Sequence, residues 1–191
     1  AKIAARLMGG QTLRDLGITR DPQPGFVSAK EVVLPFIKFP GVDILLGPEM
    51  RSTGEVMGIA RDMGAAFAKS QLAAGSHLPV SGTVFLSLND RDKPKAAALA
   101  KDLIELGFSL VATDGTAARI REKGLAVTDV FKVGEGRPNI VDLMINKQVH
   151  WIINTPFGVQ SKYDEKAIRR TALELGLPTM TTLAAAKAAV A

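Results

Sequence analysis

The stretch of sequence that determines the fold is residues 83–116, TVFLSLNDRDKPKAAALAKDLIELGFSLVATDGT. Residues 83–88 form a short apolar run, which is typical of a buried strand. Asp92 suits the N-cap of a following helix, and Pro94 suits its first turn. The apolar face of this helix and its stop signal are given by Leu99, Leu103, Leu106 and Gly107. Residues 108–112 then read as a second strand, so the stretch predicts a strand–helix–strand unit.

The same alternation continues to the end of the chain. Turn residues separate short apolar runs from segments with helical spacing, and the links between them are short. The expected elements are helix 116–123, strand 126–130, helix 140–146, strand 150–153, a helix capped by Asp164 with Ile168, Ala172 and Leu175 on one face, strand 179–180 and helix 183–190. We therefore expect an α/β fold, an open, mostly parallel five-stranded sheet with helices on both faces.

The pattern before residue 76 is different. Residues 76–82, SHLPVSG, are small, polar or ring-locked and show no periodicity, so they predict a linker between residues 1–75 and a domain at 83–191. In the first part we expect an initial helix, a strand at 27–36 and a helix at 55–73 that turns Met57 and Met63 towards a core. Its apolar residues are too few to bury each other. Because an initiator Met is also missing, we expect residues 1–75 to be the end of a larger domain.

The composition excludes several classes of protein. The 191 residues include no cysteine and two histidines, so we expect no disulfides, no thiolate metal sites and no zinc site. The absence of cysteine also fits a cytoplasmic location, which we expect. No apolar run is long enough to span a membrane. The net charge of +5 comes from scattered residues, without a basic block, which favours local anion sites over nucleic-acid binding.

Ligands of such sheets bind beyond the carboxyl ends of the strands. The segment after the second predicted strand, residues 113–116, reads TDGT and directly precedes a helix. Free N–H groups at a helix start attract anions, Gly115 allows close approach, and Thr113 and Thr116 offer hydroxyl groups. The same residues also suit ordinary helix caps, so both interpretations stay open.

Other strand ends supply matching groups. Lys93 follows the first strand, Lys132 the third, and Asn154 and Thr155 the fourth. Each lysine alone could serve only solubility. Together, two ammonium groups, hydroxyls and an amide at one rim predict a site for a phosphorylated, hydrogen-bonding ligand.

Three stretches carry a family resemblance: residues 28–36, SAKEVVLPF; 38–43, KFPGVD; and 46–58, LGPEMRSTGEVMG. They resemble the end of the second synthetase half, an ATP-grasp domain, of the carbamoyl phosphate synthetase large subunit. The part after the linker resembles the methylglyoxal-synthase-like domain that follows it there, with TDGT at 113–116 and EGRP at 135–138 as markers. The resemblance covers essentially the whole chain.

The resemblance implies a ligase that makes carbamoyl phosphate from bicarbonate, ammonia and two ATP for arginine and pyrimidine synthesis. A glutaminase subunit would supply the ammonia, and ATP with Mg²⁺ or Mn²⁺ would bind outside this chain, which would hold no catalytic residue and no cofactor. The domain after the linker would sense UMP or IMP through Lys93, Thr113, Thr116, Lys132 and Asn154. Glu31 and Thr181 match positions that contact ornithine, whereas Pro156 and Thr179 depart from the family's pattern.

Two alternatives accompany this hypothesis. A methylglyoxal synthase would need a carboxylate base, and the loop position that carries an Asp in that enzyme family lies within Gly136-Arg137-Pro138 here. Arg137 cannot act as a base at neutral pH. A pure oligomerisation module is the other alternative. Calorimetry with UMP separates it from a nucleotide sensor.

Overall fold

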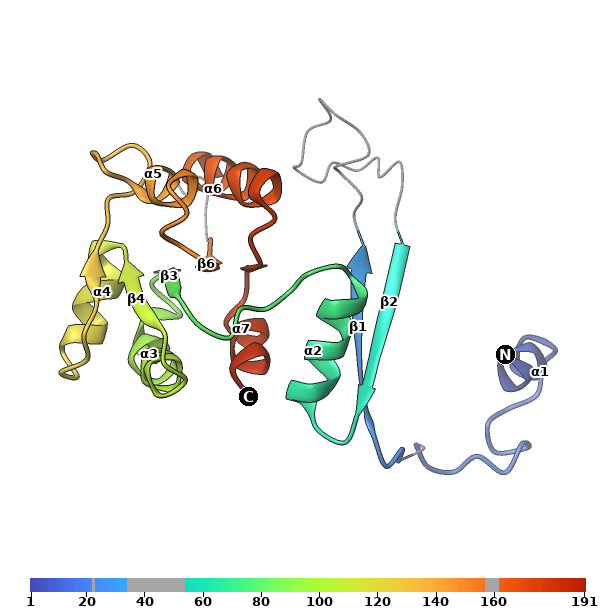
Figure 1. The fold of residues 1–191 in the computed structure, drawn as a ribbon. Coiled ribbons are helices and arrows are strands. Elements are labelled where there is room, and N and C mark those ends of the chain that lie inside the picture. Colours follow the sequence, from blue (N-terminus) through green and yellow to red (C-terminus); the bar gives the residue numbers. More distant parts are fainter. Residues whose placement is uncertain (22, 34–53, 157–161) are drawn as a thin grey trace.

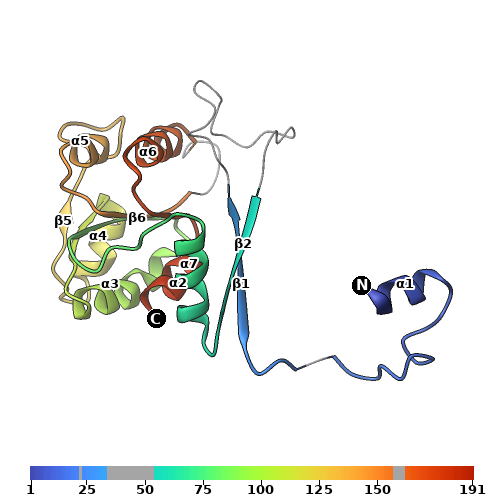
Figure 2. The same ribbon diagram turned by 45° about the vertical axis from the view of Figure 1, so that its right-hand side comes forward.

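The computed structural model describes residues 1–21, 23–33, 54–156 and 162–191. A parallel sheet with its helices occupies one part of the molecule, and a two-stranded hairpin with one helix lies beside it (Figure 1). The first helix, α1 (Lys2–Met8), buries no residue and lies apart from both (Figures 1 and 2).

The larger sheet has five strands in the order β5-β4-β3-β6-β7, and every neighbouring pair is parallel. Its strands are β3 (Thr83–Leu88), β4 (Ser109–Ala112), β5 (Thr128–Asp129), β6 (Trp151–Thr155) and β7 (Thr179–Met180). Strand β3 lies at the centre, with Phe85 in register with Val111 on one side and Ile152 on the other. The predicted open, parallel α/β sheet is confirmed.

Helices cover both faces of this sheet (Figures 1 and 2). On one face, α3 (Ala96–Glu105), α4 (Asp114–Arg121) and α7 (Leu183–Val190) pack against Val84 and Leu86. On the other face, α5 (Ile140–Ile145) and α6 (Lys162–Leu175) pack against Phe85. Because successive side chains of a strand point to opposite faces, β3 supplies both cores and is buried almost throughout.

Several predicted boundaries were wrong in detail. Leu106 and Leu175, expected on core faces, are 51% and 42% exposed, because each lies at the end of its helix, beyond the last turn that packs on the sheet. Strand β5 is only two residues long at the edge of the sheet. Helix α6 already includes Asp164, so this residue is not the N-cap. Helix α4 begins at Asp114, with Thr113 in the N-cap position.

The part before residue 76 contains the largest correction. Residues 55–73, predicted as one helix, form strand β2 (Gly54–Ala60) and helix α2 (Met63–Ala73). Strand β2 pairs antiparallel with β1 (Val27–Val33), and Asp62 starts α2 by accepting a hydrogen bond from the backbone N–H of Ala65. Residues 54–60 form a strand because β1 supplies hydrogen-bond partners for their backbone. A prediction made from one segment of sequence at a time cannot include such pairing.

Exposed apolar side chains mark the open face of the hairpin. Met57 on β2 and Met63 at the start of α2, both predicted to face a core, are 57% and 52% exposed. The other face of the hairpin is covered by α2, whose Ala66 carbonyl lies so near Gly58 that a Cβ atom there would overlap it. Residues 34–53, which include the end of the strand predicted at 27–36, lie outside the described residues.

Helix α2 also contacts the larger part of the molecule. It packs against α7, where Gly64 lies against Ala191, and Phe67 lies on the core that α3 and α7 share with the sheet. The domain boundary predicted at 76–82 stays a prediction. Helix α2 before it and helix α7 after it pack against each other. Within the described ranges, no helix has the length and apolar character needed to cross a membrane.

Candidate functional site

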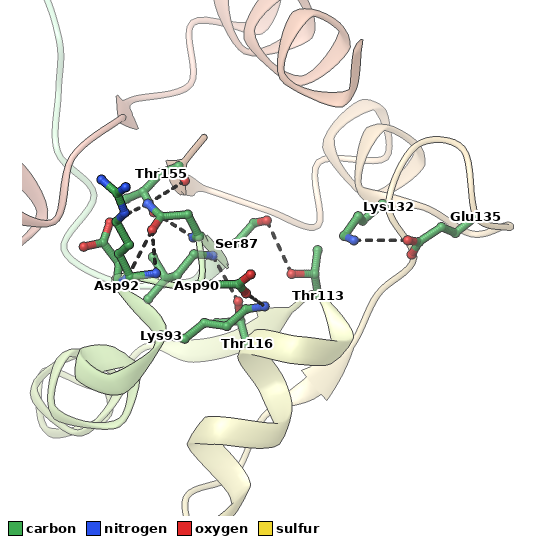
Figure 3. Close-up of polar contacts among 12 residues, drawn as sticks. Ser87, Asp90, Asp92, Lys93, Thr113, Thr116, Lys132, Glu135 and Thr155 are labelled. Atoms are coloured by element: carbon green, nitrogen blue, oxygen red, sulfur yellow. Dashed lines mark hydrogen bonds and ion pairs between the residues drawn. The ribbon is translucent and has the colours of Figure 1, made fainter. Parts of the chain in front are cut away.

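A cavity of about 340 Å³ lies at the carboxyl ends of β3, β4 and β6. Its described lining residues come from the last residues of β3 and β6, from the segments that follow β3, β4, β5 and β6, and from the start of α4 (Figure 3). They are Ser87, Leu88, Asn89, Asp90, Arg91, Lys93, Thr113, Gly115, Lys132, Asn154, Thr155 and Pro156. The strand-end rule therefore located the cavity correctly, and six of the seven residues predicted for the phosphorylated ligand line it.

Asn89 fixes the loop after β3 to the end of β6. Its side-chain amide donates hydrogen bonds to the carbonyl and hydroxyl oxygens of Thr155 and to the carboxylate of Asp92, at 2.7–3.1 Å. Its side-chain oxygen accepts from the backbone N–H of Arg91 at 2.9 Å. This network joins two neighbouring strand ends and sets where Lys93 leaves the loop.

Lys93 lies across the start of α4. Its ammonium group is 2.6 Å from the carboxylate of Asp90, and a Cβ atom added to Gly115 would come within 2.9 Å of its Nζ. The hydrogen bond from Lys93 and its charge, with a smaller effect from Lys132, lower the pKa of Asp90. Gly115 is therefore needed for the position of this lysine as well as for close approach of a ligand to the backbone.

Thr113 occupies the N-cap position of α4 without capping it through its side chain. It is 4% exposed, and its hydroxyl donates to the Oγ of Ser87 on β3 at 3.3 Å. Thr113 is therefore the N-cap by position, as the ordinary interpretation expects, but its hydroxyl caps no backbone N–H of α4. The hydroxyl pair lies beside the first turn of α4, where the partial positive charge of a helix N-terminus favours an anion (Figure 3).

Lys132 reaches the cavity from the opposite side (Figure 3). It pairs with Glu135 at 3.1 Å within the loop between β5 and α5. Asn139 closes that loop: its side chain accepts from the backbone of Val141 and Asp142, and Asp142 accepts in return from the backbone of Asn139. This capping box ties the loop to the start of α5.

Thr116 is the predicted residue outside the lining. It is fully buried beneath the cavity, and its hydroxyl oxygen accepts from the backbone N–H of Leu88 at 3.0 Å. Thr155, only 3% exposed, accepts in the same way from the backbone N–H of Asn89. Both hydroxyls hold the end of β3 in place, so a contact of Thr116 with a ligand is not supported by its position.

The sequence reasoning missed Ser87, Asn89, Asp90 and Arg91 as lining residues. The signal was present, since the four surround the end of the first predicted strand, where the strand-end rule applies with equal force. Pro156, noted as a departure from the family's pattern, does line the cavity.

The two residues implied for ornithine lie elsewhere. Glu31 is on β1, where its carboxylate accepts from the side-chain amide of Gln71 of α2 at 2.9 Å. Thr181 is exposed between β7 and α7. Among the described residues, no group of three His, Cys, Asp or Glu side chains is placed to hold a metal ion.

Comparison with known proteins agrees with this fold and cavity. Residues 95–181 match the MGS-like domain family. They include β4, β5, β6 and β7 and all of the cavity's lining that follows β4 and β6. The part of the sheet and of the cavity that lies within residues 95–181 is therefore similar to an MGS-like domain.

The similarity extends beyond that domain to the whole chain. The chain is 55% identical over 190 residues to the carbamoyl phosphate synthase large chain of Rhodopirellula baltica, 54% identical over 192 residues to that of Synechocystis sp., and 54% identical over 188 residues to that of Pseudomonas putida. These alignments cover 98–100% of this chain but 18% of each relative. The predicted resemblance to the carbamoyl phosphate synthetase large subunit is confirmed, for a chain that spans under a fifth of its length.

Proposed function

We propose that the cavity binds the phosphate of a nucleotide effector. The observation that carries this proposal is the convergence of Lys93, Lys132 and Thr113 with the first turn of α4 around one cavity. Two ammonium groups supply charge, while hydroxyl and backbone N–H groups supply directed hydrogen bonds, which together match a phosphate monoester. Asn154, at the neighbouring end of β6, offers an amide to the sugar or base.

The chemistry of the lining supports binding rather than catalysis. Asp90 is the one carboxylate among the described lining residues, and it is ion-paired with Lys93. A lowered pKa makes a carboxylate a weaker base, so Asp90 is poorly suited to take a proton from carbon. A methylglyoxal synthase activity therefore has little support in this cavity.

The relatives' name supports a wider proposal for the protein in which this chain works. It would be the large chain of a ligase that makes carbamoyl phosphate from bicarbonate, ammonia and two ATP, in the cytoplasm, with a glutaminase subunit as partner. ATP and its metal ion would bind outside this chain, in the remaining four fifths of such a large chain. The nucleotide would then regulate the ligase from its MGS-like domain. A role for ornithine at Glu31 and Thr181 belongs to the same proposal.

Isothermal titration calorimetry of the chain with UMP, IMP and ornithine tests the binding proposal. Uridine is the matched ligand control, because it lacks only the phosphate. We expect UMP or IMP to bind and uridine to bind far more weakly. Absence of heat with both nucleotides at millimolar concentration would contradict the proposal.

A lysine variant tests whether the nucleotide occupies this cavity. Lys132→Gln should weaken nucleotide binding by about 1–3 kcal/mol, the usual range for a lost charge-assisted hydrogen bond. Lys123→Gln removes the same charge from an exposed position outside the lining, and should leave the affinity nearly unchanged. Equal losses in the two variants would place the nucleotide elsewhere or assign the effect to net charge.

A further inference from the structure

Each lysine at the cavity has a carboxylate partner three residues away. Lys93 pairs with Asp90 at 2.6 Å, and Lys132 pairs with Glu135 at 3.1 Å. The ammonium groups that would receive a phosphate are therefore already satisfied by anions of the protein itself. A phosphate can reach their full charge only by displacing these carboxylates.

The two members of the Lys93 pair are held very differently. The Lys93 side chain is 26% exposed and lies against Gly115, whereas the Asp90 side chain is 93% exposed. A second hollow of about 400 Å³ borders the same three residues and gives Asp90 space on the side of Pro94 and Arg119. The carboxylate can therefore swing away from the ammonium group while the lysine stays in place.

We propose that Asp90 and Glu135 are internal competitors that set the affinity of the cavity and its preference for doubly charged phosphate. This inference rests on the proposed function and deepens it. Each carboxylate occupies the ammonium group with one negative charge. A phosphate monoester carries about 1.5 to 2 negative charges at neutral pH and can displace it, whereas a phosphodiester carries one and gains little.

The size of the competition follows from the exposure of the pairs. Exposed ion pairs favour the paired over the open state by a factor of about 1.4 to 5. If a ligand binds only the open state, its apparent dissociation constant rises by a factor of one plus this paired-to-open ratio. Each carboxylate should therefore weaken phosphate binding by about two- to sixfold. The low pKa of Asp90, caused chiefly by Lys93, keeps this competitor ionised throughout the neutral range.

Calorimetry of the whole chain with UMP and with inorganic phosphate tests the competition. Asp90→Asn and Glu135→Gln should each tighten binding about two- to sixfold, because each frees an ammonium group while keeping a side chain of nearly the same shape. Asp102→Asn is the matched control. It removes one negative charge from an exposed position on α3, outside the linings of both hollows, and should change the affinity much less.

A double mutant separates competition from general electrostatics. In a Lys93→Gln background there is no ammonium group to free, so Asp90→Asn should no longer tighten binding. Persistence of the gain there, or an equal gain from Asp102→Asn, would overturn the inference.

Unchanged or weaker binding in both Asp90→Asn and Glu135→Gln would also overturn it, and would mean that the carboxylates position the lysines. These results are distinct from failure of the proposed function. If the unmodified chain binds neither UMP nor phosphate, the proposed function falls, and this inference falls with it. If the unmodified chain binds but the variants are not tighter, only this inference falls.

Discussion

Replacement of Gly115 by alanine should separate ligand binding from stability. The new Cβ atom would lie 2.9 Å from Nζ and 3.3 Å from Cε of Lys93, whereas unstrained carbon contacts are about 3.5–4.0 Å. The end of the lysine must therefore move by roughly 0.5–1 Å. A displacement of that size spoils the alignment of a charge-assisted hydrogen bond, whose loss costs about 1.5–3 kcal/mol. We expect nucleotide phosphate to bind about 10- to 100-fold more weakly.

The fold should tolerate this substitution. Gly115 lies in the first turn of α4, and the atoms that a methyl group would meet belong to the flexible end of one side chain. Alanine favours a helix over glycine by up to about 1 kcal/mol, so the free energy of unfolding should stay the same or rise slightly.

Urea unfolding and UMP titration on the same variant would measure both effects. Gly134→Ala provides the control, because a Cβ atom there meets no other atom within 4 Å. An unchanged UMP affinity in Gly115→Ala would refute the placement of the phosphate beside Lys93 and Gly115. A loss of stability as large as the loss of affinity would show instead that Gly115 serves the fold.

Three further predictions concern the surroundings of the cavity. Thr116→Val leaves the buried N–H of Leu88 without its acceptor, so urea unfolding should show a loss of about 1–3 kcal/mol, while UMP affinity changes less than in Thr113→Val. Gly82→Ala should destabilise the chain by more than about 1 kcal/mol in the same assay, because φ of Gly82 is +113° and the new Cβ would lie 2.7 Å from the His150 ring. Gly134→Ala, the control, should cause no such loss. The pKa of the Asp90 carboxyl, measured by NMR, should lie below the ordinary aspartate value and should rise in Lys93→Gln. The contribution of this carboxyl to stability is present above its unfolded-state pKa and is lost as the pH falls through its lowered folded-state pKa. An unchanged Asp90 pKa in Lys93→Gln would contradict the assigned cause.

The sequence predicted the sheet well because its signals were local. The apolar run at 83–88, the proline after Asp92 and the glycine at 107 each act over a few residues, and each lies at or next to the boundary that it predicted. The first part failed for the opposite reason. Residues 54–60 form a strand only through their pairing with residues 27–33, a contact between segments more than twenty positions apart.

The site was predicted at the level of strand ends but not of hydroxyl directions. Thr113 and Thr116 are equivalent in sequence, both hydroxyl residues beside Gly115 at a helix start. In the structure one lies at the cavity and the other lies beneath it. Thr113 is the N-cap, with extended backbone, whereas Thr116 lies within the first turn of α4 and its hydroxyl accepts from the backbone N–H of Leu88 at the end of β3. Sequence spacing alone could not say which of the two lines the cavity.

The ion pairs at the two lysines were equally invisible to motif reasoning, although their spacing was in view. Asp90 precedes Lys93 by three residues, and Glu135 follows Lys132 by three. In a helix such spacing marks a surface pair of small effect on stability. Here the pairs lie beside a cavity, so the same weak interaction would act on the proposed ligand binding. An ion pair that contributes little to folding can still change ligand affinity severalfold, because the ligand must break it each time it binds.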